Sequence, residues 1–368
     1  MKFDRRLITN FDWFLLLITV IITTIGALNL YSATFTVEEL NGTPIYLKHI
    51  CWIFAGVFFM FLSFGLDWHS LERYAYPLFI TTILLLILVI LFGKSVAGSK
   101  RWLQLGSVSL QPSEFLKISV IFMLSKYFNR YQSQGFDKKR DFLFPFFAIV
   151  LPVFLVLIQP DLGTALIIIL ISLSLLLFNG IKLKNILVMS SVFFAGLPII
   201  WFFLKNYQKM RVLTFINPDL DPLGSGYHII QSKIAIGSGA LWGKGFLKGT
   251  QSRLLFLPEQ HTDFVFSVFA EEWGFIGTFV IVFLYLIIIL WGLRIATNSR
   301  ERFTAFLAFG IVSMFFWQTF INIGMSLGVV PVVGVPLPLM SYGGSSTVSF
   351  LLGIGVLINI STRRFVNA

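Results

Sequence analysis

The chain has 368 residues, of which 57% are hydrophobic and only 12% are charged. Soluble domains carry about 25% charged residues, so this composition excludes an ordinary soluble enzyme. The net charge of +11 could suggest nucleic-acid binding. However, the Lys and Arg residues stand in short blocks between apolar runs, a pattern that indicates helix orientation in a membrane. A single cysteine, Cys51, excludes a disulfide framework and a zinc site built from cysteines.

Ten segments are predicted to cross a membrane as helices, because each is close to the length of about 20 mostly apolar residues that a span needs. The first run is too long for a signal peptide and is therefore expected to be a retained span. The segments are residues 13–37, 49–66, 74–93, 110–130, 142–160, 162–181, 185–204 and 264–293, and residues 303–362 hold two further helices around a re-entrant or surface loop.

An even number of spans places both termini on one side of the membrane. Most blocks of Lys and Arg fall on that side, which the positive-inside rule makes cytoplasmic. We therefore expect an all-α, polytopic integral membrane protein that forms one domain over residues 1–368, with a long external loop at about 205–262. No nucleotide-binding fingerprint is evident, which disfavours ATP-driven transport by this chain.

The first polar cluster on the predicted external side contains Arg101, Trp102, Glu114 and Lys117. Glu114 and Lys117 lie three residues apart on one helix face, so they can neutralise each other where an unpaired charge costs about 2.5 to 3.5 kcal/mol. One reading is a structural ion pair. The other is that Arg101 and Lys117 bind an anionic headgroup beside Trp102, which the presence of basic residues on the outer face favours.

Asp161 stands in a short connection between two predicted spans. An aspartate at this place commonly caps the helix that follows it. A polar contact to substrate is the alternative reading. The sequence by itself leaves both roles open.

Glu259, His261 and Asp263 lie where the long loop re-enters the membrane. In an extended backbone the three share one face, and in a helix Glu259 and Asp263 still do. Carboxylates at such a boundary are partly desolvated, which raises their pKa and makes them stronger bases. The alternative for Asp263 is a capping role at the next helix.

Residues 331–346 contain three prolines and three glycines without any charge, so they cannot form one continuous helix. Irregular backbone at membrane depth is tolerated where it is buried in protein or lines a cavity. We therefore predict a re-entrant segment in which the amides of Gly343 to Ser346 open the last helix and can receive an anion. Its candidate substrate-binding residues are Ser341, Gly343, Gly344 and Ser345. A purely structural broken helix is the alternative.

Six ordered blocks of this chain resemble the signature segments of the SEDS family of shape, elongation, division and sporulation proteins. The similarity runs over nearly the whole chain, and its short start and end resemble the RodA-type elongation members more than the FtsW-type division members. The blocks are RWL at 101–103, QPSEFLK at 111–117, QPDLGTA at 159–165, GSGALWGKG at 237–245, LPEQHTDF at 257–264 with AEE at 270–272, and the Pro- and Gly-rich run at 331–346.

The resemblance implies a peptidoglycan glycosyltransferase that polymerises lipid II into β-1,4-linked strands on the outer face of the bacterial cytoplasmic membrane. It also implies a class B penicillin-binding protein as partner, a place in the elongation machinery, and no nucleic-acid ligand. Asp263 matches the family's essential aspartate. Trp102, Glu114, Lys117 and Asp161 fall on motif positions tied to the central cavity.

The implied reaction is chemically reasonable with one carboxylate. The acceptor hydroxyl needs a general base, for which Asp263 is the candidate, whereas the diphosphate leaving group needs cations rather than a proton. Arg101, Lys117 or a divalent cation such as Mg or Mn held by the external acids could supply that charge. A flippase or transporter for a lipid-linked sugar is the main alternative function, and a scaffold that recruits cell-wall enzymes is a third.

Overall fold

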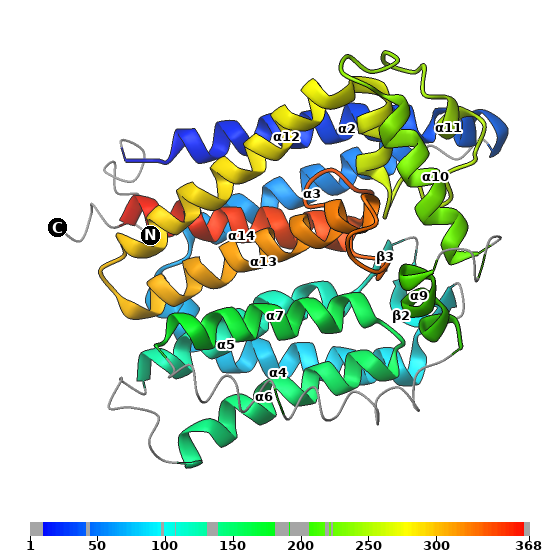
Figure 1. The fold of residues 1–368 in the computed structure, drawn as a ribbon. Coiled ribbons are helices and arrows are strands. Elements are labelled where there is room, and N and C mark those ends of the chain that lie inside the picture. The colour runs from blue at the N-terminus through cyan, green and yellow to red at the C-terminus, as the bar shows by residue number, and fades with distance from the viewer. Residues whose placement is uncertain are drawn as a thin grey trace.

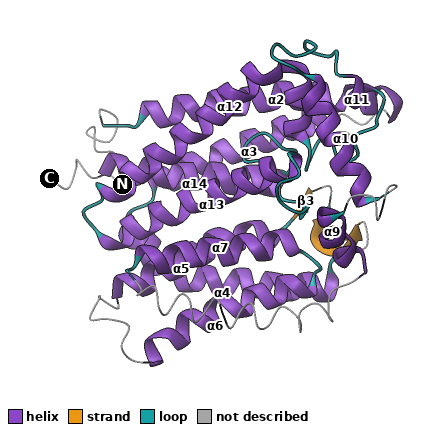
Figure 2. Cartoon of the chain, viewed as in Figure 1, coloured by secondary structure: helices purple, strands orange, loops and turns teal. Residues whose placement is uncertain are grey.

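The computed structural model describes residues 10–41, 45–96, 99–106, 108–130, 139–180, 191, 206–217, 221 and 224–363. Within these residues the chain forms a bundle of long helices, with a small sheet and several short helices gathered at one end (Figures 1 and 2). The beginning of the first long helix and the end of the last one lie at the opposite end of the bundle. This arrangement agrees with the predicted polytopic architecture.

Nine of the ten predicted spans correspond to helices in the described residues, and the tenth, 185–204, lies outside them except for residue 191. Six of these helices, α2, α3, α4, α12, α13 and α14, are long and apolar enough to cross a membrane. The bounds are α2 Trp13–Asn41, α3 Ile45–Gly65, α4 Trp68–Phe92, α5 Pro112–Arg130, α6 Lys139–Ile158, α7 Leu162–Phe178, α12 Val265–Thr297, α13 Arg302–Ser326 and α14 Gly344–Arg363.

The centre of the bundle is built from α5, α13 and α14, whose side chains are buried along most of their length. Small residues allow close helix contacts here, as in other membrane bundles. At Gly56 and Gly355, on the facing helices α3 and α14, an added Cβ would collide with the neighbouring helix. The Asn359 amide on α14 donates to the carbonyls of Ser63, Phe64 and Leu66, which satisfies the exposed end of α3.

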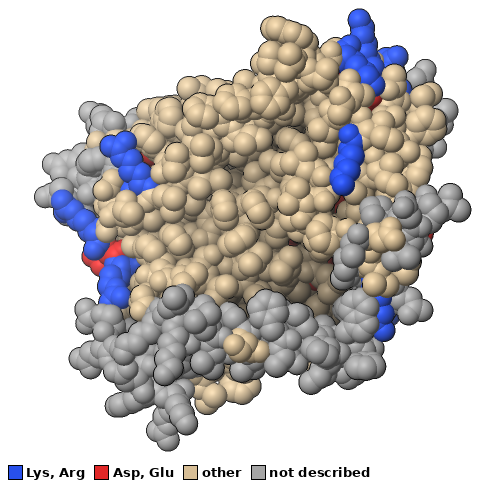
Figure 3. All heavy atoms as spheres, in the orientation of Figure 1, with Lys and Arg blue, Asp and Glu red and all other residues tan. Residues whose placement is uncertain are grey.

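The outer surface of the bundle is apolar around its middle. Large side chains such as Phe54, Phe92 and Phe279 are more than half exposed. In a water-soluble protein, so much exposed apolar surface would favour aggregation. In Figure 3 the Lys and Arg side chains of the described residues gather toward the two ends, with a broad band of uncharged residues between them. This distribution fits a protein whose middle is covered by lipid.

The connection between α4 and α5 folds into a three-stranded antiparallel sheet, which the sequence analysis did not anticipate. Its strands are β1 Lys94–Val96, β2 Ser99–Leu105 and β3 Val108–Leu110, in the order β1-β2-β3. The register pairs Trp102 with Lys94 and Leu103 with Leu110. The middle strand therefore holds Arg101 and Trp102 at the end of the bundle.

The predicted long loop also contains helices. These are α9 Asn206–Ile216, α10 Ser225–Ser238 and the single turn α11 Thr250–Arg253. The stretch between α10 and α11 is joined to α12, because the Phe275 amide donates to the Ala240 carbonyl at 2.9 Å and the Lys244 amide to the Glu271 carbonyl at 3.0 Å. Gly274, with φ 63° and ψ −162°, interrupts the helical geometry of α12 at this junction. Glycine is required there because other residues rarely adopt this conformation.

Candidate active site

Asp263 lies in a tight turn immediately before α12. Its backbone amide donates to the Glu259 carbonyl at 3.1 Å, and its own carbonyl accepts a bond of 3.0 Å from the Asn322 amide on α13. The same Asn322 amide group donates to the Val335 carbonyl at 2.8 Å. The N-cap of α12 is Phe264, so the alternative that Asp263 caps this helix is wrong. The Asp263 carboxylate can therefore have a role other than helix capping.

Burial raises the pKa of Asp263 from 3.8 to about 6. The nearby Arg211 guanidinium lowers this pKa, while the negative charge of Glu259 raises it further. The side chain is nevertheless half-buried rather than sealed, since it lines two cavities. A carboxylate with a pKa near 6 is mostly ionised at neutral pH and is a stronger base than an ordinary aspartate.

Two cavities meet at Asp263, and the residues that line both are Arg211, Glu259 and Asp263. The first, which we call the Arg101 cavity, has a volume of about 320 Å³ and extends towards β2, α7 and the start of α14. The second, which we call the His228 cavity, has a volume of about 380 Å³ and extends towards α9 and α10. Asp263 therefore has access to a ligand on either side.

Arg101 is fixed at the wall of the Arg101 cavity by contacts with the turn before α7. Its Nε donates to the Gln159 carbonyl at 3.3 Å, its Nη2 donates to the Pro160 carbonyl, and its Nη1 lies 3.6 Å from Asp161 Oδ1. Asp161 in turn accepts bonds from the Thr164 amide at 3.1 Å and the Thr164 hydroxyl at 2.9 Å. Asp161 is thus the cap of α7, as one of the two readings predicted, and it lines the cavity as well.

Glu114 and Lys117 form the ion pair that their spacing predicts. Lys117 Nζ lies 2.8 Å from Glu114 Oε2, and both side chains are almost completely buried in α5. Lys117 also lies 5.8 Å from the centre of the Phe350 ring. Glu114 is among the residues that line the Arg101 cavity and Lys117 is not. In this structure the lysine therefore neutralises Glu114, and a contact between Lys117 and substrate stays a prediction.

The irregular segment between α13 and α14 closes the same end of the bundle. As predicted, residues 327–343 do not continue either helix, and α14 begins at Gly344. The Ser341 hydroxyl donates to the Thr262 carbonyl at 2.6 Å and accepts from the Leu337 amide at 2.8 Å, while the Tyr342 amide donates to the His261 carbonyl at 2.8 Å. These bonds hold the segment against the turn that carries Asp263.

The structure brings eight of the twelve predicted site residues to one cavity. The residues that do not line this cavity are Lys117, His261, Ser341 and Gly344. Ser341 holds the surrounding backbone, and the other two outside α5 pack next to the cavity wall. The rings of His261 and Tyr342 lie 6.1 Å apart, and an added Cβ at Gly344 would collide with Trp52. Burial lowers the pKa of His261, which leaves its ring neutral at pH 7. The eight are Arg101, Trp102, Glu114, Asp161, Glu259, Asp263, Gly343 and Ser345.

Sequence reasoning missed three important groups. Arg211 on α9 and His228 on α10 line the His228 cavity, and Gln318 on α13 lines the Arg101 cavity. Gln318 is buried, and its Oε1 has no hydrogen-bond partner among the described atoms. Arg211 could have been identified as a basic residue on the outer face, and Gln318 as a polar residue inside a span.

Among the described residues, no three His, Cys, Asp or Glu side chains are arranged so that they could hold a metal ion together. The external acids are instead engaged individually. Glu271, for example, accepts from Lys244 Nζ at 2.7 Å and from the Thr250 amide at 2.8 Å. Within the described part of the chain, the side chains thus do not form a metal site bound by protein ligands alone.

Comparisons with known proteins agree with this geometry. The structure is similar to a chain in a structure titled "Structural coordination of polymerization and crosslinking by a peptidoglycan synthase complex", with a TM-score of 0.82, 30% identity and coverage of 96% of this chain and 98% of that one. It is also similar to the rod shape determining protein RodA of Thermus thermophilus, with a TM-score of 0.72, 28% identity and coverage of 96% and 98%.

Sequence relatives give the same result. The peptidoglycan glycosyltransferase MrdB of Escherichia coli is 46% identical over 80% of this chain and 79% of its own length. The peptidoglycan glycosyltransferase RodA of Treponema pallidum is 34% identical over 98% of this chain and 99% of its own length. The model of the FtsW, RodA and SpoVE cell cycle proteins matches residues 12–365. The chain therefore belongs to the FtsW/RodA/SpoVE family, the SEDS family that its six sequence blocks resemble.

Proposed function

We propose that this chain, a peptidoglycan glycosyltransferase like its relatives, polymerises lipid II with Asp263 as the general base. The observation that carries the proposal is the position of the Asp263 carboxylate, which forms the common wall of two cavities at the same end of the bundle as the sheet and the loop helices. The general base must contact the acceptor hydroxyl where the two sugars meet. A carboxylate between two cavities suits this role.

The reaction at this site is a direct displacement. Asp263 takes the proton of the acceptor 4-hydroxyl while that oxygen attacks the anomeric carbon of the donor sugar. The bond between this carbon and the diphosphate oxygen breaks, and undecaprenyl diphosphate leaves with the electron pair. Attack on the face opposite the leaving group inverts the anomeric centre and gives a β-1,4 link.

The donor is assigned to the Arg101 cavity because its lining suits a sugar diphosphate. Arg101 supplies a positive charge, and Gly343 and Ser345, at the start of α14, supply backbone amides at the helix terminus. The unpartnered Gln318 Oε1 can accept a hydrogen bond from a sugar hydroxyl or amide, and Trp102 offers a ring for the sugar face. Desolvated donors directed at the developing charge are an effective source of transition-state stabilisation.

A divalent cation is a separate proposal. Because the described residues lack a set of three ligands, a Mg or Mn ion would be held mainly by the substrate diphosphate, with at most one or two external carboxylates. Titration of the activity with EDTA and then with each metal tests this. Activity that survives complete chelation would exclude the ion.

The cellular setting is also part of the proposal. The chain would lie in the bacterial cytoplasmic membrane with both termini in the cytoplasm and Asp263 on the outer face. The similarity to a chain of a complex for polymerisation and crosslinking supports a class B penicillin-binding protein as partner. The similarity to a rod shape determining protein supports a role with the elongation machinery.

The test is lipid II polymerisation by the purified chain together with a class B penicillin-binding protein that has no glycosyltransferase domain of its own. We expect polymer from the wild type and none from Asp263→Asn, with normal complex formation by both. Asp67→Asn is the matched control, because Asp67 is a half-exposed acid at the opposite end of the bundle and contacts His69 and Arg363.

Two outcomes would overturn the assignment. Normal polymerisation by Asp263→Asn would transfer the role of base to another acid, with Glu259 as the first candidate. Absence of polymer from the wild type, combined with transfer of labelled lipid II across proteoliposome membranes, would instead support the flippase alternative.

A further inference from the structure

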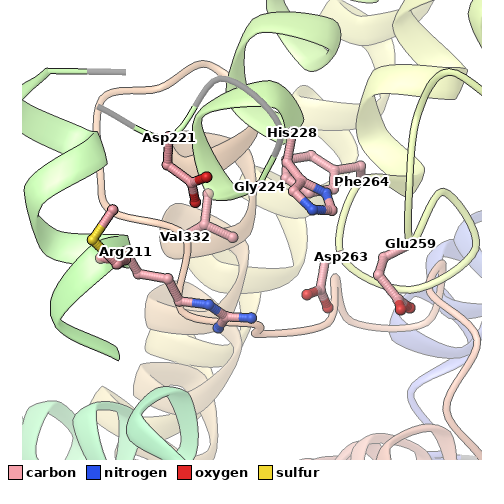
Figure 4. Close-up of a pocket in the computed structure, with 9 residues that line it drawn as sticks. Arg211, Asp221, Gly224, His228, Glu259, Asp263, Phe264 and Val332 are labelled. Carbon is pink, nitrogen blue, oxygen red and sulfur yellow. The ribbon is translucent and has the colours of Figure 1, made fainter. Parts of the chain in front are cut away.

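The His228 cavity is the space that the donor assignment leaves unused. Helix α9 contributes Arg211 and helix α10 contributes His228, and Asp221 stands between them in the chain. Figure 4 shows the Arg211 guanidinium and the Asp263 carboxylate directed toward each other, with Asp221 and His228 on the other side of the space. The cavity thus places hydrogen-bonding groups around one side of the proposed base.

The charges in this cavity argue against a diphosphate. Three carboxylates, those of Asp221, Glu259 and Asp263, line it together with a single guanidinium. The Asp221 carboxylate also lies against Gly224 at the start of α10, where its negative charge opposes binding of an anion at that helix end. The Arg101 cavity shares Arg211, Glu259 and Asp263, but its two other carboxylates are paired with cations, Asp161 with Arg101 and Glu114 with Lys117. The His228 cavity instead adds the Asp221 carboxylate and no second guanidinium. An anion is therefore less favoured in the His228 cavity than in the Arg101 cavity, and a neutral ligand suits it better.

The same groups suit a neutral sugar. Carboxylates accept hydrogen bonds from hydroxyls, and Arg211 donates them. Burial, followed by the positive charge of Arg211, lowers the pKa of His228, so its ring is neutral at pH 7 and can both donate and accept. Phe264 and Val332 give an apolar surface for the sugar ring. The cavity volume of about 380 Å³ lies at the lower end of the range of small-molecule sites.

The geometry of the displacement reaction indicates whether this cavity binds the donor sugar or the acceptor sugar. Inversion requires the attacking hydroxyl and the leaving group on opposite sides of the anomeric carbon. If the diphosphate lies in the Arg101 cavity, the acceptor must approach Asp263 from the other side. Gly334 lies at this junction, since an added Cβ there would be in van der Waals contact with Asp263 Oδ2 at 3.4 Å and with Arg211 Nη1 at 3.7 Å.

We propose that the His228 cavity is the acceptor subsite, which binds the terminal N-acetylhexosamine of the acceptor, and that Arg211 holds this sugar with its 4-hydroxyl against Asp263. The proposal rests on the proposed function. It deepens that function by separating the acceptor subsite from the donor subsite and by assigning residues of α9 and α10 to one of them.

The experiment measures acceptor and donor separately. A lipid II analogue without the 4-hydroxyl acts only as donor, so it is kept saturating while normal lipid II is varied as acceptor. We expect Arg211→Gln to raise the acceptor KM by about ten- to a hundredfold, because a hydrogen bond to a charged group is lost. Arg211→Lys should recover part of the affinity. Arg253→Gln is the control, since Arg253 is an exposed basic residue on α11 that is not among the lining residues of either cavity.

Donor affinity is measured without turnover, by binding of the same analogue to Asp263→Asn with and without Arg211→Gln. We expect less than a twofold change. Weaker donor binding with an unchanged acceptor KM would overturn the subsite assignment, and so would no change in either quantity. If Arg211→Gln does not fold, His228→Gln gives the same comparison. An active Asp263→Asn enzyme would instead refute the proposed base, which keeps the two failures distinct.

Discussion

The raised pKa of Asp263 leads to a pH dependence that an ordinary aspartate would not produce. If the ionised carboxylate is the base and its pKa is about 6, kcat/KM for polymerisation should fall with one proton as the pH drops below about 6. At pH 5 the activity should be about one tenth of its plateau, whereas an aspartate with an ordinary pKa of about 3.9 would still be more than about 90% ionised. The assay is polymerisation of labelled lipid II at limiting concentration between pH 4.5 and 8.5.

Two substitutions perturb this midpoint in opposite directions. Removing the positive charge in Arg211→Gln should raise the pKa of Asp263, because the guanidinium favours the ionised form. Removing the negative charge in Glu259→Gln should lower that pKa. A wild-type midpoint near pH 4, or shifts of both variants in the same direction, would refute the electrostatic account of the site.

Stability gives a check that does not require activity. Because burial raises the pKa of Asp263 in the folded state from 3.8 to about 6, the cost of its charge is absent at low pH, develops as the pH rises from about 4 to about 6, and is constant above that. Asp263→Asn should therefore be more stable than the wild type at pH 8, by at most about 3 kcal/mol and by less where water in the cavities screens the charge. The two proteins should converge below about pH 4, as measured by thermal unfolding in detergent.

Two further predictions concern buried charges. Lys117→Ala should destabilise the protein by about 3 to 5 kcal/mol, because it leaves Glu114 buried without its 2.8 Å partner. The double variant Glu114→Gln with Lys117→Met should recover most of the thermal stability. A small effect of Lys117→Ala alone would contradict the pairing of Lys117 with Glu114. Glu271→Gln should loosen α11 without unfolding the bundle, since the carboxylate of Glu271 accepts from Lys244 and from the Thr250 and Gln251 amides. Faster limited proteolysis near α11 with an unchanged unfolding temperature is the expected result, and equal proteolysis rates would argue against this anchor.

Those parts of the fold that depend on local composition could be predicted from the sequence. An apolar run of about 20 residues has few options other than a span, and each predicted span in the described residues is a helix. The prolines and glycines of 331–346 excluded a continuous helix, and α14 does begin at Gly344. Asp161 and Asp263 were both identified, although only the structure showed that Asp161 caps α7 and that Asp263 does not cap α12.

The parts that depend on contacts between distant segments could not be predicted. The strands β1 and β3 have three residues each, too few to establish an alternating pattern. The helices α9 and α10 contain Lys, Arg and His residues and were read as a loop. Gln318 looks like one polar residue in an apolar helix until the turn at Asp263 and the start of α14 are placed around it.

The basic residues show why local pairing is a poor guide to function at this site. Lys117 was favoured as a ligand for an anionic headgroup because it is a basic residue on the predicted outer face, but Glu114, three residues away, neutralises it inside α5. Arg211 stands 52 positions before Asp263 in the sequence, and it faces that carboxylate because α9 lies at the end of the bundle that carries the small sheet (Figures 1 and 4). A charge that is satisfied within its own helix turn has little reason to meet a ligand. A cation brought to a cavity by tertiary structure, and left partly accessible there, is the better candidate for binding substrate.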